Sequence, residues 1–277
     1  MSLRTNELLI EAGKSERHYW RDIWHYRELL YFLAWRDVKV RYKQAVLGIA
    51  WVVVRPLLTM AVLTLVFHRI AGLDSEGETP YALLVLAGIL PWQFFATAFA
   101  DSGNSLVGNS QMIAKIYFPR IIVPVSSVLA SLVDFLVTLC LLLPLMLWYD
   151  HWPDARVMLL PLFMLLGLAV CLGSGIALAA VNVRYRDVRF VIPFVVQFGL
   201  YLSPVGFSVS EIPQAWRWLY DLNPMVGVIE GFRWCLLGGQ NALPAAALAS
   251  SLLFAVGLLW FGIRYFRRVE KTFADVI

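Results

Sequence analysis

The stretch Trp35–Leu58, WRDVKVRYKQAVLGIAWVVVRPLL, decides how this chain is built. Its first half is basic and aromatic, whereas its second half is almost wholly apolar apart from Arg55 and Pro56. We predict a helix over Tyr31–Lys43, because like residues recur at steps of three and four. The basic face comprises Arg36, Lys39 and Lys43, and the opposite face comprises Tyr31, Trp35, Val38 and Tyr42. Such a helix is typical of a membrane interface, and we expect the chain to enter the bilayer near Ala45.

Two roles fit this helix equally well at this stage. It could be a juxtamembrane anchor that only orients the first span. It could also face a partner protein or an anionic lipid headgroup.

Composition excludes an ordinary soluble domain. Of the 277 residues, 60% are hydrophobic and only 15% are charged, whereas a soluble domain carries roughly 25% charged residues. Eighteen of the twenty-three Lys and Arg residues lie in the segments 1–43, 101–120, 182–189 and 264–277. This bias places those segments and both termini in the cytoplasm. Because the cations follow the topology of the membrane, the net charge of +4 does not indicate binding of nucleic acid.

Apolar runs of about 20 residues, the length needed to cross a bilayer, recur along the chain. We predict an all-α integral membrane protein with a single permease domain over 1–277. Residues 1–43 form its cytoplasmic N-terminal part, which is polar and partly helical before the interface helix, and 46–263 form the six-span region. The spans are expected at 46–70, 81–100, 121–148, 156–181, 190–207 and 244–263, with an acidic outside loop from Asp74 to Glu78. Gly167, Gly173, Ser174 and Gly175 are small residues that favour close helix packing in the fourth span.

The region 208–239, between the last two spans, predicts two short helices. Ser210 and Pro213 can open the first, and Asn223 with Pro224 can open the second as a cap and first-turn pair. Each has roughly ten to fourteen residues, too few to cross the bilayer. We expect these re-entrant helices to lie near the outer interface and to line or close a pathway.

The sequence predicts no catalytic residues, no metal site and no nucleotide site in this chain. GNSLVGNS at 103–110 has the glycine spacing of a phosphate loop, but Asn109 stands where that loop requires Lys. The three cysteines have unrelated spacings, and HExxH, G-x-S-x-G and paired-carboxylate patterns are absent.

Two charges lie deep in predicted spans. Arg55 is about 14 Å into the first span and Asp134 about 20 Å into the third, counted from the cytoplasmic side. Charges at such depth face a partner or a wet cavity. Arg55 could pair with Asp134 between packed helices, or it could line the path of an anionic substrate.

Several aromatic side chains lie inside the predicted spans. They could line a substrate channel by stacking on sugar rings, or they could simply pack in the core. They are Phe94, Phe95, Phe99, Phe194, Phe198 and Tyr201.

Six stretches, in order along residues 30–270, resemble the permease subunit of polysaccharide ABC exporters. They are WRDVKVRYKQAVLGIAWVVVRPLL at 35–58, LAGILPWQFF at 86–95, SLVGNSQMIAKIYFPRIIVPV at 105–125, NVRYRDVRFVIPF at 182–194, YLSPV at 201–205 and LNPMVGVIEGFRW at 222–234. That family exports lipid-linked O-antigen, capsule or teichoic acid.

The resemblance implies a chain in the inner (cytoplasmic) membrane that binds no cofactor itself. Two copies would each dock on a cytoplasmic ATPase that holds ATP and Mg, and an undecaprenyl-linked polysaccharide would cross between the copies among membrane lipids. An O-antigen-like polymer is our first expectation, with capsule or teichoic acid as the alternative. An ion-coupled secondary transporter is the alternative from another class, and a membrane-bound glycosyltransferase is a third.

The resemblance also implies roles for particular residues. A coupling helix at 104–119 would meet the ATPase through a set comprising Asn104, Ser105, Asn109, Gln111, Lys115, Tyr117 and Arg120. The lipid pyrophosphate would enter past Arg36, Arg41, Arg184, Arg186 and Arg189, which positive-inside topology alone also explains. The helices at 210–237 would form an external gate containing Trp216, Trp218, Asn223, Glu230, Arg233 and Trp234.

Overall fold

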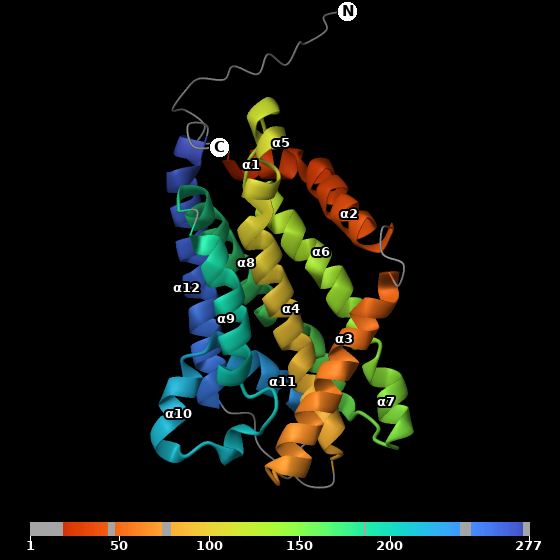
Figure 1. Cartoon of the computed structure of the whole chain (residues 1–277). Coiled ribbons are helices and arrows are strands. Elements are labelled where there is room, and N and C mark those ends of the chain that lie inside the picture. Colours follow the sequence, from red (N-terminus) through yellow and green to blue (C-terminus); the bar gives the residue numbers. More distant parts are fainter. Residues whose placement is uncertain (1–18, 44–47, 74–78, 186, 239–244, 274–277) are drawn as a thin grey trace, which may run out of the picture.

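The computed structural model describes residues 19–43, 48–73, 79–185, 187–238 and 245–273, and every regular element in these ranges is a helix (Figure 1). The predicted all-α class is therefore confirmed. The predictions for residues 1–18, for the loop Asp74 to Glu78 and for Arg186 lie outside the described residues. In order, the helices are α1 Tyr19–His25, α2 Arg27–Lys43, α3 Gly48–Leu63, η2 Thr64–Ile70, α4 Tyr81–Gly108, α5 Ser110–Lys115, α6 Ile122–Leu139, α7 Leu142–Trp148, η3 Ala155–Leu159, α8 Leu160–Arg184, α9 Val188–Leu202, η4 Val209–Glu211, α10 Gln214–Asp221, α11 Pro224–Leu237, α12 Ala245–Val269 and η5 Glu270–Thr272.

Five helical segments of the described chain are long and apolar enough to cross a bilayer: Ala50–Ile70, Tyr81–Gly108, Ile122–Trp148, Ala155–Arg184 and Ala245–Val269. The expected span at 190–207 is shorter than predicted. Its helix α9 has 15 residues, which is about 22 Å at the helical rise. Helix α9 ends at Leu202 because Ser203, with ψ of 146°, is extended, as a residue before proline usually is.

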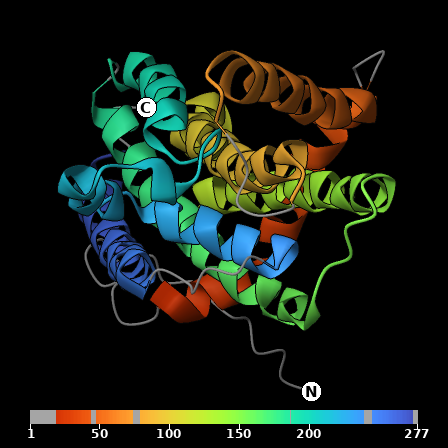
Figure 2. The ribbon, with the colours of Figure 1, turned by 90° about the horizontal axis from the view of Figure 1, so that it is seen from below.

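Helix α4 forms the centre of the bundle. In its most apolar stretch 83% of the residues are buried, against 6% for Ala50–Ile70. It packs against α3, α6, α8, α9 and α11, and Figure 2 shows it between these elements when the bundle is seen from below. The first span thus leaves most of its surface outside the chain's own core, although its mean hydropathy is higher than that of α4.

Helix α4 also extends past the predicted boundary at 100. It continues to Gly108, so the coupling helix expected at 104–119 is not one helix; only six residues of it form the separate α5. The polar residues remain helical because their side chains bond back to the same helix. Asn104 donates to the carbonyl of Ala100 at 2.9 Å, and Ser105 donates to that of Ser102 at 2.6 Å.

Helix α2 packs along α6, and this contact divides the predicted aromatic face. Val38 is buried and Tyr42 is half-buried, whereas Tyr31 and Trp35 are 69% and 47% exposed. The aromatic spacing identifies a stripe, but only the contact with α6 decides which part of that stripe is covered. Leu33 is buried as well, and Arg41 forms an ion pair with Asp134 of α6.

Glycines allow α8 and α12 to approach closely, as the small residues of the fourth span predicted. A Cβ atom on Gly173 would lie 2.5 Å from the backbone nitrogen of Leu259, and one on Gly262 would meet the carbonyl of Gly173. Gly175 faces Ser102 of α4, where an added Cβ would lie 2.6 Å from the hydroxyl.

The two short helices before α12 start near the predicted caps. The Asn223 side chain accepts a hydrogen bond from the Met225 amide at 3.0 Å, and Pro224 begins α11. Pro213 precedes α10, which has only eight residues and is shorter than predicted. The third span is broken between α6 and α7, where the ring of Pro144 excludes the normal helical position of the Cys140 carbonyl four residues earlier.

We predict that Gly173→Ala lowers the free energy of unfolding by about 1–3 kcal/mol, because the new methyl group would force two backbones apart. Thermal unfolding of the detergent-purified chain would measure this. Gly257→Ala in α12 is the matched control, since nothing lies within 4 Å of its added Cβ, and it should be neutral or stabilising by up to about 1 kcal/mol. Equal melting temperatures for the two variants would contradict the close crossing.

Candidate functional site

The bundle has two chemically different ends. One end, called here the α5 end, carries α1, α5 and η5; the opposite end, the α10 end, carries α7 and α10 (Figure 1). The described parts of the four basic segments are at or near the α5 end. The predicted coupling and entrance residues therefore belong there, and the predicted gate belongs to the α10 end.

The α5 end presents an exposed surface of mixed apolar and polar side chains. Val107, Ile116 and Tyr117 are 51%, 58% and 58% exposed, and Gln111 and Lys115 beside them are also exposed. Asn104 is exposed, while Ser105 is buried in the chain's own core. Of the predicted coupling residues, those at and after α5 form this outward surface, which we call the α5 surface.

Helix α2 is bonded directly to the α5 surface. Arg36 donates to the Asn109 side-chain oxygen at 3.0 Å and forms an ion pair with Asp37 at 2.8 Å. Asn109 also donates to the carbonyl of Ser105 at 2.8 Å. A predicted entrance residue and a predicted coupling residue are thus joined, so that a displacement of α5 acts on α2.

A buried cluster holds α1, the start of α6 and the end of α12 together. Glu270 accepts hydrogen bonds from the Arg120 amide at 2.9 Å and from the Tyr19 hydroxyl at 3.2 Å, and Arg267 lies 4.8 Å from the Tyr19 ring centre. Burial raises the pKa of the Glu270 carboxyl above its ordinary value, although these donors oppose it. Burial and Glu270 together raise the pKa of the Tyr19 hydroxyl. Arg120 is therefore a structural contact of the chain as well as a predicted coupling residue.

A polar network links α2, α4 and α6 below the α5 surface. Arg41 forms ion pairs with Asp101 and Asp134, and the Tyr42 hydroxyl donates to Asp134. Ser131 donates to Asp101 at 3.3 Å. Burial would lower the pKa of the Arg41 guanidinium, but the two carboxylates outweigh it and raise that pKa; burial and the bond to Asp134 raise the pKa of Tyr42.

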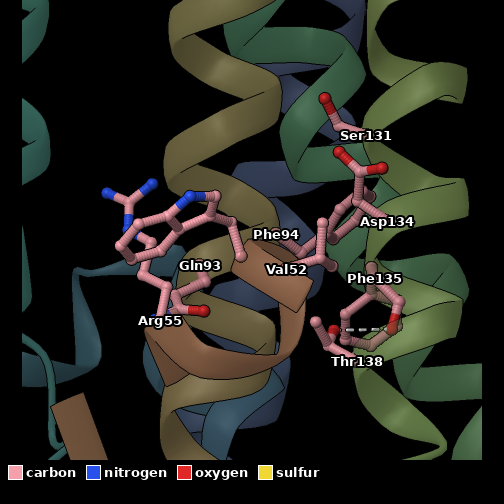
Figure 3. A pocket seen from close by; sticks show the side chains of 9 residues that line it. Val52, Arg55, Gln93, Phe94, Ser131, Asp134, Phe135 and Thr138 are labelled. Atoms are coloured by element: carbon pink, nitrogen blue, oxygen red, sulfur yellow. Dashed lines mark hydrogen bonds between the residues drawn. The ribbon is translucent and has the colours of Figure 1, made fainter. Parts of the chain in front are cut away.

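The Arg55–Asp134 pair, one of the two interpretations of the deep charges, is wrong, because Asp134 bonds to Arg41 and Tyr42 instead. Arg55 and Asp134 line the same hollow of about 70 Å³, together with Trp51, Val52, Gln93, Phe94, Ser131, Phe135 and Thr138. Figure 3 shows the Arg55 side chain across this hollow from Asp134. The hollow has room for a few water molecules. Arg55 itself is exposed and has no ion pair among the described residues.

The other predicted entrance and channel residues fall into separate places. Arg41 is committed to the network, whereas Arg184 and Arg189 are exposed and stack on the adjacent Tyr185 and Phe190 rings. Phe94, Phe95 and Phe99 are buried in the chain's own core, and Phe94 also lines the hollow that contains Arg55. Phe194, Phe198 and Tyr201 on α9 are 57%, 50% and 61% exposed.

At the α10 end, Arg233 replaces missing helical hydrogen bonds. It is 7% exposed and donates to the carbonyls of Val205 and Phe207 at 2.9 Å and of Leu84 at 3.2 Å. It also forms an ion pair with Glu230 at 3.1 Å. The non-helical segment 203–208 that follows α9 is therefore satisfied inside the protein, as apolar surroundings require.

The remaining predicted gate residues lie on α10, on α11 or at the N-cap of α11. Asn223 donates to the Ser203 hydroxyl at 2.9 Å, besides capping α11. Trp234 is half-buried under the Arg156 guanidinium, 4.9 Å from its ring centre. Trp216 and Trp218 on α10 are 58% and 62% exposed, where an interfacial position is expected.

Sequence reasoning missed Asp101, Glu270 and Tyr19. Asp101 had a usable signal, because it is an acidic residue that follows an apolar run without a break, inside a helix that continues to Gly108. Glu270 and Tyr19 had no such signal, since they contact each other from elements that are far apart in the chain. Among the described residues, no three His, Cys, Asp or Glu side chains gather closely enough to hold a metal ion.

Comparison with known proteins matches residues 28–237 to the family described as ABC-2 type transporter. The chain is 29% identical over 260 residues to an O-antigen export system permease of Myxococcus xanthus, covering 93% of this chain and 98% of that protein. It is 26% identical over 254 residues to an O-antigen export system permease of Klebsiella pneumoniae, covering 90% and 95%. A polysialic acid transport protein of Escherichia coli is 22% identical over 247 residues, covering 86% and 92%.

We predict that Arg41→Gln lowers the free energy of unfolding by about 2 kcal/mol, because Asp101 and Asp134 would then face each other without a cation. Fully buried pairs cost about 3–5 kcal/mol when one partner is lost, but the Asp101 side chain is 38% exposed and solvent screens it. Denaturation of the detergent-purified chain would measure the difference.

Two further variants make this prediction specific. Lys39→Gln, which changes an exposed cation two residues away in α2, should alter the stability by less than about 0.5 kcal/mol. Adding Asp134→Asn to Arg41→Gln should recover part of the loss, since one of the two uncompensated acids is removed. An Arg41→Gln variant as stable as Lys39→Gln would show that the network contributes nothing.

Proposed function

The chain belongs to the ABC-2 type transporter family, and on that premise we propose that it is the membrane subunit of an ATP-driven exporter of an O-antigen-like, lipid-linked surface polysaccharide. The observation that carries the proposal is the match to O-antigen export permeases along almost the whole of both chains. The similarity to a polysialic acid transport protein supports a polymer of sugars as the class of substrate. The polymer would be carried on an undecaprenyl pyrophosphate lipid.

The α5 surface is the docking site for the ATPase in this proposal. Its exposed apolar residues, Val107, Ile116 and Tyr117, lie in a polar, basic end of the protein, where a partner protein can cover them. ATP and Mg would be held entirely by that partner, because the phosphate-loop-like stretch of this chain has Asn109 in place of Lys and that residue is bonded to Arg36. The chain would then supply no catalytic residue.

Motion of the docked ATPase would reach the membrane by two routes. The Arg36–Asn109 hydrogen bond ties α5 to α2, and the Arg41 ion pairs tie α2 to the spans α4 and α6. Helices α2 and α4 would therefore move together as a lever. ATP binding can shift the conformation of this chain only if the ATP-bound partner binds one conformation of it more tightly than another. Helices α2 and α4 would transmit that preference to the spans.

Two copies of the chain would face each other through α3 and α9. These helices stand on either side of α4 on one face of the bundle (Figure 2), and both leave large apolar side chains uncovered. The exposed set comprises Trp51, Val54, Leu58 and Val62 on α3, and Phe190, Phe194, Phe198 and Tyr201 on α9. The polymer would pass along this face, with the α9 aromatics as stacking surfaces and Arg55 at its edge.

We place six crossings in the membrane, with α9 as the fifth. Its 15 helical residues are continued by the buried segment 203–208, whose backbone is satisfied by Arg233, so the pair can complete the crossing. The cation bias then puts the α5 end and both termini in the cytoplasm. Helices α10 and α11 lie at the outer end, where they would gate the exit of the polymer.

Another class of transporter would use the internal charges differently. In an ion-coupled carrier, Asp101 and Asp134 would bind and release the coupling ion. Both carboxylates already form ion pairs with Arg41, which favours a structural role for them. A capsule or teichoic acid polymer would use the same architecture and differs only in the sugar that the path accepts.

We expect the full-length chain to co-purify with the ATPase that is encoded beside it, and the complex to hydrolyse ATP faster when the lipid-linked polymer is added. Tyr117→Asp should reduce the amount of bound ATPase at least tenfold, because it places a charge within the apolar docking patch. Tyr149→Asp is the matched control: it changes a similarly exposed tyrosine at the α10 end and should bind the ATPase normally.

The proposal fails if the unaltered chain forms no complex with an ATPase, or if the isolated chain itself hydrolyses ATP. Equal loss of binding in Tyr117→Asp and Tyr149→Asp would move the docking site away from the α5 surface. Transport driven by an ion gradient in vesicles that lack ATP would favour the secondary transporter.

A further inference from the structure

A second hollow lies at the α5 end, between the last turns of α8 and α12. It has a volume of about 310 Å³ and is lined by Arg184, Tyr265, Arg268 and Val269. Small-molecule sites begin at about this size, so the hollow can take a lipid headgroup. It lies on different elements from the hollow that contains Arg55, and none of the interactions described above uses it.

The two arginines of this hollow are not neutralised by the chain. No carboxylate lies within ion-pair distance of Arg184 or Arg268 among the described residues, although Arg184 stacks on Tyr185. Four arginines elsewhere in the chain differ in this respect, because each has a carboxylate partner: Arg36, Arg41, Arg156 and Arg233. The lining therefore offers two guanidinium groups and the hydroxyl of Tyr265 as donors, and its residues include no acid.

The hollow is at the depth of lipid headgroups. Trp260 and Phe261, two turns before Arg268 on α12, are 62% and 51% exposed, and tryptophan at the end of a span marks the membrane–water interface. Arg264 lies over the Trp260 ring, 5.2 Å from its centre. A guanidinium one turn further along the helix reaches the layer in which the lipid phosphates lie.

We propose that this hollow binds the phosphate group of a resident anionic phospholipid in the membrane leaflet at the α5 end. Guanidinium groups bind phosphate oxygens through paired, charge-assisted hydrogen bonds, and basic pockets between spans on the cytoplasmic side are suited to anionic headgroups. Arg184 ends α8 and Arg268 lies near the end of α12, so one phosphate would bridge the two helices beyond their Gly173–Gly262 crossing.

The bridging phosphate would hold the ends of α8 and α12 together beside the Glu270 cluster. An alternative explanation for the two arginines is that they stabilise the C-terminal ends of their helices through the helix dipole. That role requires no phosphate. Lipid binding that is lost when either arginine is replaced therefore distinguishes a phosphate site from dipole stabilisation. The inference concerns a lipid that stays in place, and it holds whichever polymer is exported.

Native mass spectrometry of the full-length chain in detergent, titrated with dioctanoyl phosphatidylglycerol, tests the proposal. We expect one tightly retained phosphatidylglycerol per chain and at least tenfold weaker retention of dioctanoyl phosphatidylcholine. Arg184→Gln and Arg268→Gln should each weaken phosphatidylglycerol binding by about tenfold or more, as expected for lost hydrogen bonds to a charged group. Arg184→Lys should bind phosphatidylglycerol more tightly than Arg184→Gln and less tightly than the unaltered chain, because lysine still binds phosphate as a point charge but cannot form the paired hydrogen bonds.

The matched control is Arg264→Gln, which removes an exposed cation one turn before Arg268 on the same helix. A general surface attraction amounts to about a fivefold effect per cation, so Arg264→Gln should stay within that range. Equal losses in Arg264→Gln and Arg268→Gln would overturn the proposal, as would equal retention of the two phospholipids. Unchanged melting temperatures in detergent without added lipid would show that the variants are folded.

A competition arm separates a resident phospholipid from the transported lipid carrier, which also bears phosphate. Geranylgeranyl diphosphate serves as the probe for an isoprenoid diphosphate. It should leave the bound phosphatidylglycerol in place at equal concentration. Displacement of the phospholipid by this probe, with loss of probe binding in Arg268→Gln, would assign the hollow to the carrier and overturn the assignment to a resident lipid.

Discussion

The structure depends on one constraint: polar groups within an apolar bundle must find their partners inside the protein, because lipid offers none. Arg233 shows the constraint for backbone groups. It donates to two carbonyls of the buried, non-helical segment after α9 and to a third, that of Leu84, in α4. Asn182 shows it for a span interior, where its amide donates to the carbonyl of Gly103 at 2.8 Å. These bonds determine which helices can be interrupted and where.

The same constraint joins the α5 end to the interior. Arg41 is shared between Asp101 and Asp134, so one cation forms ion pairs with two acids that belong to different spans. Helix α2 is therefore bound to both α4 and α6, and its other bond, from Arg36 to Asn109, leads outward to the α5 surface. A helix that composition describes as a membrane-surface element is, in three dimensions, the connection between the exposed α5 surface and the spans.

Apolar surface that the chain does not bury is as informative as its core. The central α4 is covered on nearly all sides, while α3 and α9 leave aromatic and aliphatic side chains open on one face. Lipid can cover such a face, and so can a second copy of the chain. Arg184 and Arg268 form a different kind of open surface, because neither cation has a carboxylate partner among the described residues.

The sequence alone determined the helical class, the positions of the apolar segments, the asymmetry of charge and the cap at Asn223, because these features depend on neighbouring residues. It also identified Arg36, Asn109 and Arg233 as residues of interest. Only the tertiary structure decided that Asp134 pairs with Arg41 instead of Arg55, and that Phe94 and Phe99 are buried. Both outcomes depend on how the helices lie against one another. Contacts between residues such as Arg41 and Asp134, 93 positions apart, are set by packing, which no local pattern records.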